Sequence, residues 1–298
     1  MKKVIAIDLG ATNLRVALVD EQLTIIKCVR EKSVHKDEDA LYEQIKRMIE
    51  EILANVSDAD SITSIGISAA GFVHENEIKF SPNLEIGKFD LCDRLEEDFP
   101  NMKAHMANDA NCSALVEALY GAGKNYETPI FITISSGIGV GVVNHKHLIN
   151  LPLECGHFYV NYKNTVGQTN IRFYELEQIC SGNGIVNLCK INNLEVENAE
   201  EFFKLVLARD KQARKIYDDW LQIMGSFISN LQVTFNSDAI VLSGGVMKSK
   251  VVFYNDLLSV SNAFVAPFPV RKIKFVNAQF DQDTGIIGGA AIALNEED

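Results

Sequence analysis

Three short turns rich in glycine and hydroxyl side chains each follow an apolar, strand-like run. They are Gly10-Ala11-Thr12, Ser135-Ser136-Gly137-Ile138-Gly139 and Ser243-Gly244-Gly245. Glycine lets backbone N–H groups approach an anion closely, and three such turns suit a triphosphate. Each turn alone is also ordinary hairpin chemistry, so the prediction of a phosphate site rests on their conjunction.

A P-loop is excluded as the phosphate-binding element. The segment Gly121-Ala122-Gly123-Lys124-Asn125 has neither the spacing nor the hydroxyl of the G-x-x-x-x-G-K-[ST] motif.

One carboxylate is a candidate general base. Asp109 stands between an apolar run, residues 102–107, and the helical pattern that follows it. A carboxylate beside a sugar hydroxyl can take its proton in phosphoryl transfer. The alternative is structural, since Asn108 or Asp109 can equally cap the following helix.

Hydrophobic periodicity predicts the elements that position these residues. Apolar runs indicate strands at 4–8, 14–19, 23–29, 61–69, 102–107, 129–134, 140–144 and 238–243. Spacing near 3.6 indicates helices over 37–56 and 110–120 and through much of 182–235. A pattern of strand, turn and strand occurs twice, which predicts two halves that face each other across a cleft.

Length and charge narrow the function classes. The 298 residues suggest two domains or lobes. The 28 Lys and Arg against 40 Asp and Glu give a net charge of −12, which argues against a nucleic-acid partner. The apolar start is too short for a signal peptide and no run could span a membrane, so we expect a cytoplasmic protein. The 6 scattered cysteines form no C-x-x-C pair and are interpreted as reduced thiols.

The sequence resembles the ROK proteins (repressor, open reading frame, kinase) over nearly its whole length. The resemblance rests on an ordered set of motifs: two phosphate motifs at 8–15 and 133–141, a catalytic segment at 108–111 with Glu117, the E-x-G-H sugar motif at 154–157, an adenosine-binding strand and turn at 236–245, and a C-terminal helix at 283–290. It implies an α/β, two-lobed actin-like ATPase fold (hexokinase-type, ribonuclease H-like) with a central cleft. The implied lobes are residues 1–117 plus 285–298 and residues 118–284.

The resemblance also implies a function and its residues. The expected reaction is ATP-dependent phosphorylation of a hexose or N-acetylhexosamine at the 6-hydroxyl, by a homodimer, with ATP and Mg²⁺ as cofactors. Asp109 is implied as the general base, and Asp8 as the carboxylate that holds hydrated Mg²⁺. The residues implied for the sugar are Asn83, Asn108, Glu154, His157 and Glu177, and those implied for the nucleotide are Asp8, Gly10, Thr12, Thr133, Ser136, Gly137, Gly244 and Gly245.

The chain departs from the family where most ROK kinases bind a structural zinc ion. In those kinases a C-x-C-G-x-x-G-C-x-E element follows the E-x-G-H histidine, and its three thiolates join that histidine on the metal. Gln168, Asn170 and Glu175 occupy the cysteine positions here. We therefore predict no zinc site, and expect an amide of Gln168 or Asn170 to hydrogen-bond to His157.

Other departures leave a second reading open. Ala11, Ser135 and Ser243 stand where glycines are usual, and the segment 142–153 that borders the sugar is shorter than usual. The alternative function is a catalytically weak or inactive sugar sensor with the same fold. The repressors of the family carry a winged-helix domain before the first phosphate strand, and only three residues precede that strand here, so repressor function is not expected.

Overall fold

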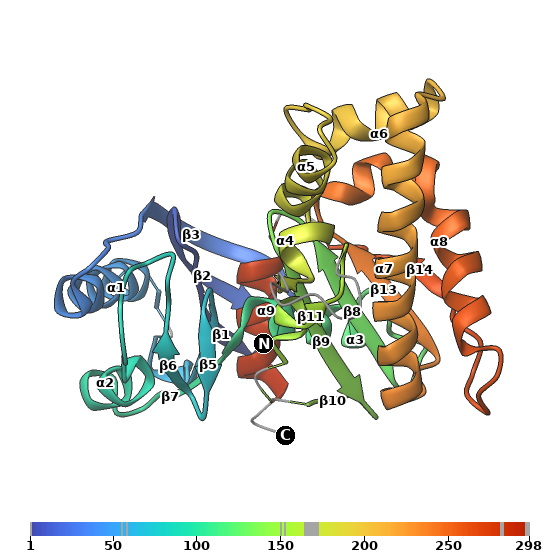
Figure 1. The fold of residues 1–298 in the computed structure, drawn as a ribbon. Helices are drawn as coiled ribbons and strands as arrows, with labels where there is room; N and C mark the ends of the chain where they lie inside the picture. The colour runs from blue at the N-terminus through green and yellow to red at the C-terminus, as the bar shows by residue number, and fades with distance from the viewer. Residues whose placement is uncertain are drawn as a thin grey trace. The chain divides into compact units, whose positions relative to one another are not determined.

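The computed structural model describes residues 2–54, 56–57, 59–149, 151, 153–163, 173–280 and 283–295 (Figure 1). The chain forms two compact units, one from residues 1–116, 148–152 and 282–298 and the other from residues 117–147 and 153–281. Relative to the expected lobes, the first unit also takes in 148–152, and its last segment begins at 282 instead of 285.

The first unit is built on a five-stranded sheet in the order β3-β2-β1-β4-β7. Its elements are β1 (Lys3–Leu9), β2 (Asn13–Asp20), β3 (Ile25–Lys32), α1 (Glu38–Leu53), β4 (Ser64–Ala69), β5 (Phe72–His74), β6 (Glu77–Phe80), α2 (Leu91–Asp98), β7 (Lys103–Asn108), the first part of α3 (Asp109–Leu119) and α9 (Thr284–Asn295). β1 is antiparallel to β2 and parallel to β4, which is parallel to β7. The carboxyl ends of β1, β4 and β7 therefore meet at one edge, where Leu9 lies opposite Ala69 and Ala69 opposite Asn108.

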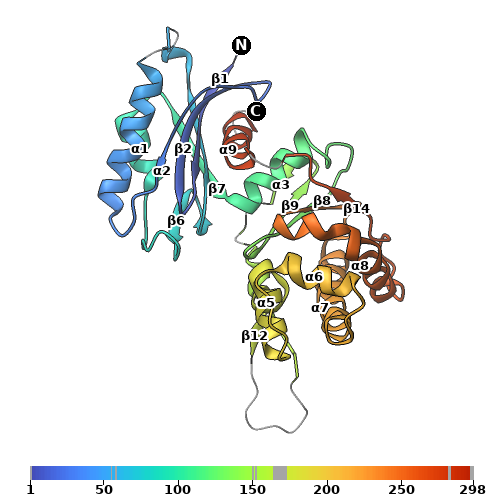
Figure 2. The ribbon, with the colours of Figure 1, turned by 90° about the horizontal axis from the view of Figure 1, so that it is seen from above.

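Helices cover both faces of this sheet. Figure 2 shows α1 and α2 on one face and α9 on the other. α1 begins where the Asp37 carboxylate accepts the Ala40 N–H at 2.9 Å, and its apolar stripe at Leu41, Ile45 and Met48 is fully buried. The core of the unit lies between this face of the sheet and these two helices.

α9 approaches the sheet through two glycines. A Cβ on Gly66 in β4 would lie 1.9 Å from the carbonyl oxygen of Gly289, and one on Gly289 would lie 2.7 Å from the carbonyl oxygen of Gly66. The Ser64 hydroxyl donates to the Ala293 carbonyl at 3.1 Å. The backbones of β4 and α9 are therefore in direct contact, and a side chain at Gly66 or Gly289 would prevent this close approach.

The third strand starts later than periodicity indicates. A strand from Leu23 was expected, but β3 begins at Ile25 and Leu23 has a positive φ of 63°. The Asp20 carboxylate accepts the N–H groups of Gln22 at 3.0 Å and Thr24 at 2.8 Å. This local turn chemistry outweighs the apolar pattern, because it ties residues 20–24 into a tight turn.

The second unit repeats the strand order of the first, as β10-β9-β8-β13-β14. Its elements are the end of α3, β8 (Pro129–Ile134), β9 (Ile138–Asn144), β10 (His147–Leu148), β11 (Tyr159–Val160), β12 (Tyr174–Glu175), α4 (Glu177–Cys180), α5 (Gly182–Ile191), α6 (Ala199–Leu207), α7 (Lys211–Phe235), β13 (Ala239–Ser243), α8 (Lys250–Val265) and β14 (Phe275–Asn277). β8 and β9 form the hairpin and β13 lies parallel to β8. The predicted repetition of strand, turn and strand is therefore present in both sheets.

An aromatic core holds the helices of the second unit together. Trp220 of α7 lies 5.6 Å from Phe203 of α6 and 5.2 Å from Phe253 of α8, measured between ring centroids, and all three side chains are buried. α7 starts at an Asp210 cap and ends at Asn236, which has a positive φ of 48°. Among the described helices, none is both long and apolar enough to cross a membrane.

Candidate functional site

Asp8 lies near the carboxyl end of β1 in an ion-paired setting. Arg15, its cross-strand neighbour on β2, donates to the Asp8 carboxylate at 2.8 Å and pairs with Asp283 at 2.7 Å. Burial raises the pKa of Asp8, and the Arg15 guanidinium opposes that rise. Gly285 packs against the same carboxylate, since a Cβ there would lie 2.3 Å from the Asp8 oxygen. Asp8 is therefore held in place from two sides.

The turn after β1 is oriented by the residues that follow β3. The carbonyl of Gly10 accepts the Ser33 hydroxyl at 2.6 Å, and the His35 ring meets the carbonyl of Ala11 at 2.7 Å. In a trans peptide the N–H points opposite to the carbonyl, so the N–H groups of Ala11 and Thr12 face away from these partners. That orientation suits binding of an anion.

A polar pocket of about 300 Å³ lies at this turn. Its lining residues are Asp8, Gly10, Thr12, Asn13, Arg15 and Arg30. Two guanidinium groups and a glycine turn suit phosphate oxygens, while a carboxylate suits a magnesium ion that keeps its waters. The first-unit residues predicted for the nucleotide thus share one pocket.

Asp109 is the first residue of α3, directly after β7. Its carboxylate and the Asn108 amide oxygen both accept the Ala110 N–H at 2.8 Å, and the Asn108 amide donates to the Gly71 carbonyl at 2.9 Å. Desolvation by the surrounding protein raises the pKa of Asp109. The side chain is exposed, so solvent reduces this rise. Capping and a base role are therefore compatible in this geometry.

Asn83 lies apart from this constellation in its own local turn. It is exposed between Ser81 and Ile86, whose backbones hydrogen-bond at 3.1 and 3.3 Å. Among the described residues, no hydrogen bond or ion pair ties Asn83 to Asn108, so its assignment remains a prediction.

Glu117, part of the catalytic segment in the resemblance, has a structural role. It is 1% exposed, and its carboxylate accepts the N–H groups of Gln279 and Phe280 at 2.7 Å and of Ala122 at 2.8 Å. A buried carboxylate with three backbone donors ties the end of α3 to two loops of the second unit.

The two phosphate turns of the second unit meet at one sheet edge. Thr133 of β8 lies opposite Ser243 of β13, so the turns that follow these parallel strands start side by side. Ser136 and Gly245 are exposed, and Gly137 accepts the Ser135 N–H at 2.9 Å. The second-unit residues predicted for the nucleotide are thereby brought together.

Gly244 is required by the backbone of the third turn. Its φ is +98°, and a Cβ would lie 2.3 Å from the carbonyl oxygen of Ile134. Only glycine meets both conditions, so the turn can lie directly against the end of β8.

The second-unit residues predicted for the sugar gather at the start of β9. The Glu177 carboxylate accepts the Ile138 N–H at 3.3 Å, and a Cβ on Gly156 would lie 2.4 Å from the Ile138 carbonyl oxygen. Glu154 and His157 flank Gly156 in the same short turn. The E-x-G-H turn and Glu177 are therefore packed next to the phosphate turn that ends at Gly137.

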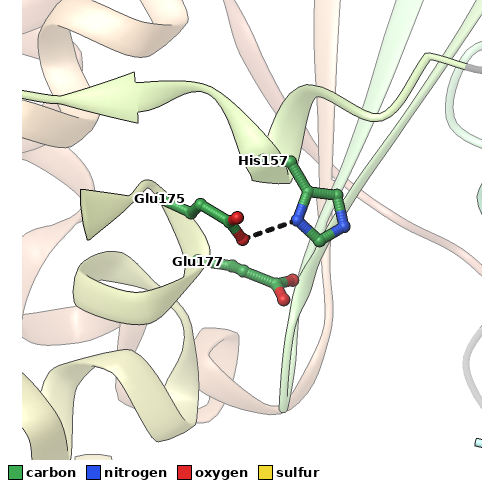
Figure 3. Close-up of side chains that lie close together, drawn as sticks. All are labelled: His157, Glu175 and Glu177. Carbon is green, nitrogen blue, oxygen red and sulfur yellow. Dashed lines mark hydrogen bonds and ion pairs between the residues drawn. The ribbon is translucent and has the colours of Figure 1, made fainter. Parts of the chain in front are cut away.

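His157 is hydrogen-bonded to Glu175. Figure 3 shows the ring with Nδ1 directed at the Glu175 carboxylate, 2.7 Å away, and Glu177 alongside. The bond to Glu175 raises the pKa of His157, desolvation opposes it, and Glu177 and Glu154 add to the rise. Gln168 and Asn170, expected to support this ring, lie outside the described residues.

The described residues around His157 do not fit a closed structural zinc site. Ligand atoms of His157, Glu175 and Glu177 lie within 4.8 Å of one another, but none is a thiolate. The 2.7 Å between Nδ1 and the Glu175 oxygen is a hydrogen-bond distance, whereas two ligands of a tetrahedral zinc lie about 3.3 Å apart. The absence of a zinc site stays a prediction to be tested by metal analysis.

Sequence reasoning gave no role to two residues of these sites. Arg15 was read only as the end of a motif, although its placement opposite Asp8 follows once the hairpin of β1 and β2 is recognised. Glu175 was read as a lost cysteine position. No local pattern pairs it with His157, because Glu175 ends β12 and Glu177 already begins α4.

Comparison with known proteins gives a coherent result. A family model described as "ROK family" matches residues 4–296. The chain is 26% identical to a glucokinase of Thermotoga maritima, covering 97% of this chain and 96% of that protein. It is 23% identical to the xylose repressor of Bacillus subtilis, covering 98% of this chain and 77% of the repressor.

Solved structures share the fold. A ROK hexokinase from Thermus thermophilus superposes with a TM-score of 0.82 at 22% identity, covering 99% of both chains. A ROK family glucokinase from Streptomyces griseus, in complex with glucose and AMPPNP, gives 0.71 at 20% identity, covering 98% of this chain and 99% of that one. The mixed α/β architecture with two sheets is therefore the actin-like ATPase fold expected from the sequence.

Proposed function

The chain belongs to the ROK family, and we propose that it is an ATP-dependent sugar kinase that phosphorylates a hexose or N-acetylhexosamine at the 6-hydroxyl. A cytoplasmic location and a homodimeric state are part of the same proposal. The relative named glucokinase and the related structure holding glucose and AMPPNP support the reaction class.

One observation carries the proposal: two acidic side chains lie at the same edge of the first sheet. Asp8 is next to the end of β1, and Asp109 directly follows β7, with β4 between them. Two strand spacings separate β1 from β7 by about 10 Å. This spacing suits one carboxylate near metal-bound phosphates and another near the acceptor hydroxyl.

The nucleotide residues support phosphate binding. Asp8 and its pocket offer an oxygen donor and room for a hydrated ion, so the residues fit Mg²⁺. Bound Mg²⁺ and ATP supply the phosphoryl group and offset its charge. Thr12, Gly137 and Gly244 would contribute backbone N–H groups or hydroxyls to the phosphate chain.

The sugar residues would orient the hydroxyl and remove its proton. Glu154, His157 and Glu177 offer the mixed acceptors and donors that sugar hydroxyls require, and Asn108 and Asn83 complete the proposed set. Asp109 takes the proton of the 6-hydroxyl as the oxygen attacks phosphorus.

A second candidate is a sugar-binding protein with weak or no transfer. Arg15 already neutralises Asp8, which reduces the negative charge that this carboxylate would offer to a magnesium ion. A relative named as a repressor supports the possibility of other uses of the fold.

A coupled ADP-release assay separates the two candidates. The panel is glucose, mannose, their N-acetyl amines, fructose, allose and β-glucosides, with Asp109→Asn as the matched inactive variant. Sugar-dependent ADP release that this variant loses supports the kinase. Sugar binding by calorimetry without ADP release supports the sensor and contradicts the kinase.

A further inference from the structure

Glu175 holds His157 in a defined orientation at the proposed sugar site. We propose that Glu175 is a positioning residue: its carboxylate fixes the His157 ring through Nδ1 so that Nε2 addresses a sugar hydroxyl. The inference rests on the proposed function, because it assumes a sugar beside His157.

The backbone places Glu175 before any ligand binds. In the pair of β11 and β12, Glu175 lies opposite Tyr159, and the Leu176 N–H donates to the Phe158 carbonyl at 2.8 Å. The Glu175 carboxylate then lies 2.7 Å from Nδ1 of His157, which ends the 3-10 turn two residues before β11. The Glu175 N–H also donates to the Gln178 side chain at 3.1 Å. The backbone of Glu175 is therefore held by its pairing with β11 and by the Gln178 side chain.

The local exposure fits a support role for Glu175 and a contact role for His157. The Glu175 side chain is 28% exposed and the His157 side chain 42% exposed. Figure 3 shows the Glu175 carboxylate next to Nδ1 and the other ring nitrogen, Nε2, on the side of the ring away from Glu175. Nδ1 is bonded to Glu175, so contact with a sugar hydroxyl is assigned to Nε2.

The hydrogen bond to Glu175 also determines which ring nitrogen of His157 carries the proton in the neutral ring. With Nδ1–H donated to Glu175, a neutral ring presents Nε2 as an acceptor and a protonated ring presents it as a donor. The carboxylates that face the ring are Glu175 on β12, Glu177 at the start of α4 and Glu154 in the preceding turn, and all three favour the charged ring. Loss of Glu175 therefore changes both the orientation of the ring and its titration.

Two substitutions separate these effects. Glu175→Ala removes the acceptor, whereas Glu175→Gln keeps an amide oxygen that can still accept from Nδ1–H but removes the charge. Glu200→Gln is the matched control, because Glu200 forms an ion pair of the same 2.7 Å length with Lys204 in the same unit. Sugar KM, ATP KM and kcat are measured for each, together with the imidazole titration of the 6 histidines by NMR.

Glu175→Ala should raise the sugar KM about tenfold and leave ATP KM and kcat within about twofold. Glu175→Gln should have a sugar KM close to that of the wild type. Its His157 pKa should be lower than in the wild type, while the pKa values of the other five histidines stay unchanged. Glu200→Gln should alter none of these values.

The contrary outcomes are distinct from failure of the kinase proposal. A sugar KM unchanged in Glu175→Ala, with wild-type turnover intact, overturns the positioning role alone. Equal rises in both KM values with a large fall in Tm show a merely structural residue and also overturn it. If the wild type releases no ADP with any sugar, the kinase proposal fails, and calorimetric Kd values decide: an unchanged Kd in Glu175→Ala, or no sugar binding at all, overturns the inference.

Discussion

The two sheets share one strand order but end in different chemistry. In the first, the strands β1 and β7 lead into the carboxylates of Asp8 and Asp109. In the second, the corresponding edge carries the backbone turns at 135–137 and 243–245. A common scaffold thus supplies acidic side chains in one unit and closely packed peptide groups in the other.

The third strand of each meander differs in length between the two units. β3 extends the first sheet by 8 residues, whereas β10 has only 2. The chain of the second unit then leaves the sheet for the segment that carries Glu154, His157 and Glu175.

Loss of the base should give the largest effect. Asp109→Asn should keep sugar binding but lower kcat by about 10²-fold or more, because the amide cannot take the hydroxyl proton. Steady-state kinetics at saturating ATP and sugar test this. Asp39→Asn, an exposed carboxylate paired with Arg94 in the same unit, is the control and should retain full activity. Near wild-type turnover in Asp109→Asn would show that the carboxylate edge of the first sheet does not supply the base.

A substitution at His157 tests the proposed role of the second unit in sugar binding. His157→Ala should raise the KM for sugar far more than the KM for ATP, since the lost contact belongs to the sugar site. An unpaired polar group costs about 1–3 kcal/mol, which is roughly 5- to 150-fold in kcat/KM. If both KM values rise equally and Tm falls strongly, His157 is a structural residue.

The backbone turns should be sensitive to a single methyl group. Gly244→Ala forces a side chain into a positive φ and against the Ile134 carbonyl, so the free energy of unfolding should fall by about 1–3 kcal/mol and the KM for ATP should rise. Denaturant unfolding and ATP kinetics measure the two effects. Gly87→Ala, where nothing lies within 4 Å of the added Cβ, should change stability by less than about 0.5 kcal/mol. Equal behaviour of the two variants would contradict the close packing of this edge.

The smallest expected effect is none at all. A zinc-selective chelator should leave the Tm of tag-free protein unchanged, and metal analysis should find well under one zinc per chain, because a carboxylate supports His157 here. Turnover should still require added Mg²⁺. Stoichiometric zinc, or unfolding with the chelator, would show that recognition in the second unit depends on a metal.

Local patterns predicted the strands that carry the site. The run from Val4 to Asp8 and the run from Pro129 to Ile134 each end at a glycine turn, and short-range periodicity is sufficient to find them. The helix expected from Ala110 begins one residue earlier, at Asp109, directly after the strand that precedes it. Family resemblance then supplied the roles that periodicity cannot give.

Contacts between distant segments could not be predicted in this way. The bond between Glu175 and His157 depends on the register of two strands of 2 residues each, which no local pattern specifies. Arg15 reaches Asp283 across 268 positions of sequence. Such pairs are fixed by tertiary packing, so the residue types were visible in advance but their partners were not.

The placement of α9 on the first sheet has a consequence for biosynthesis. Residues 284–295 are synthesised after the second unit, yet their backbone covers β4 through Gly66 and Gly289. The nascent first unit therefore exposes one apolar face of its sheet while the whole second unit is being made. The first unit is completed only after the second has been made, and a chain that stalls before Thr284 carries an unpaired sheet face open to chaperones and to aggregation.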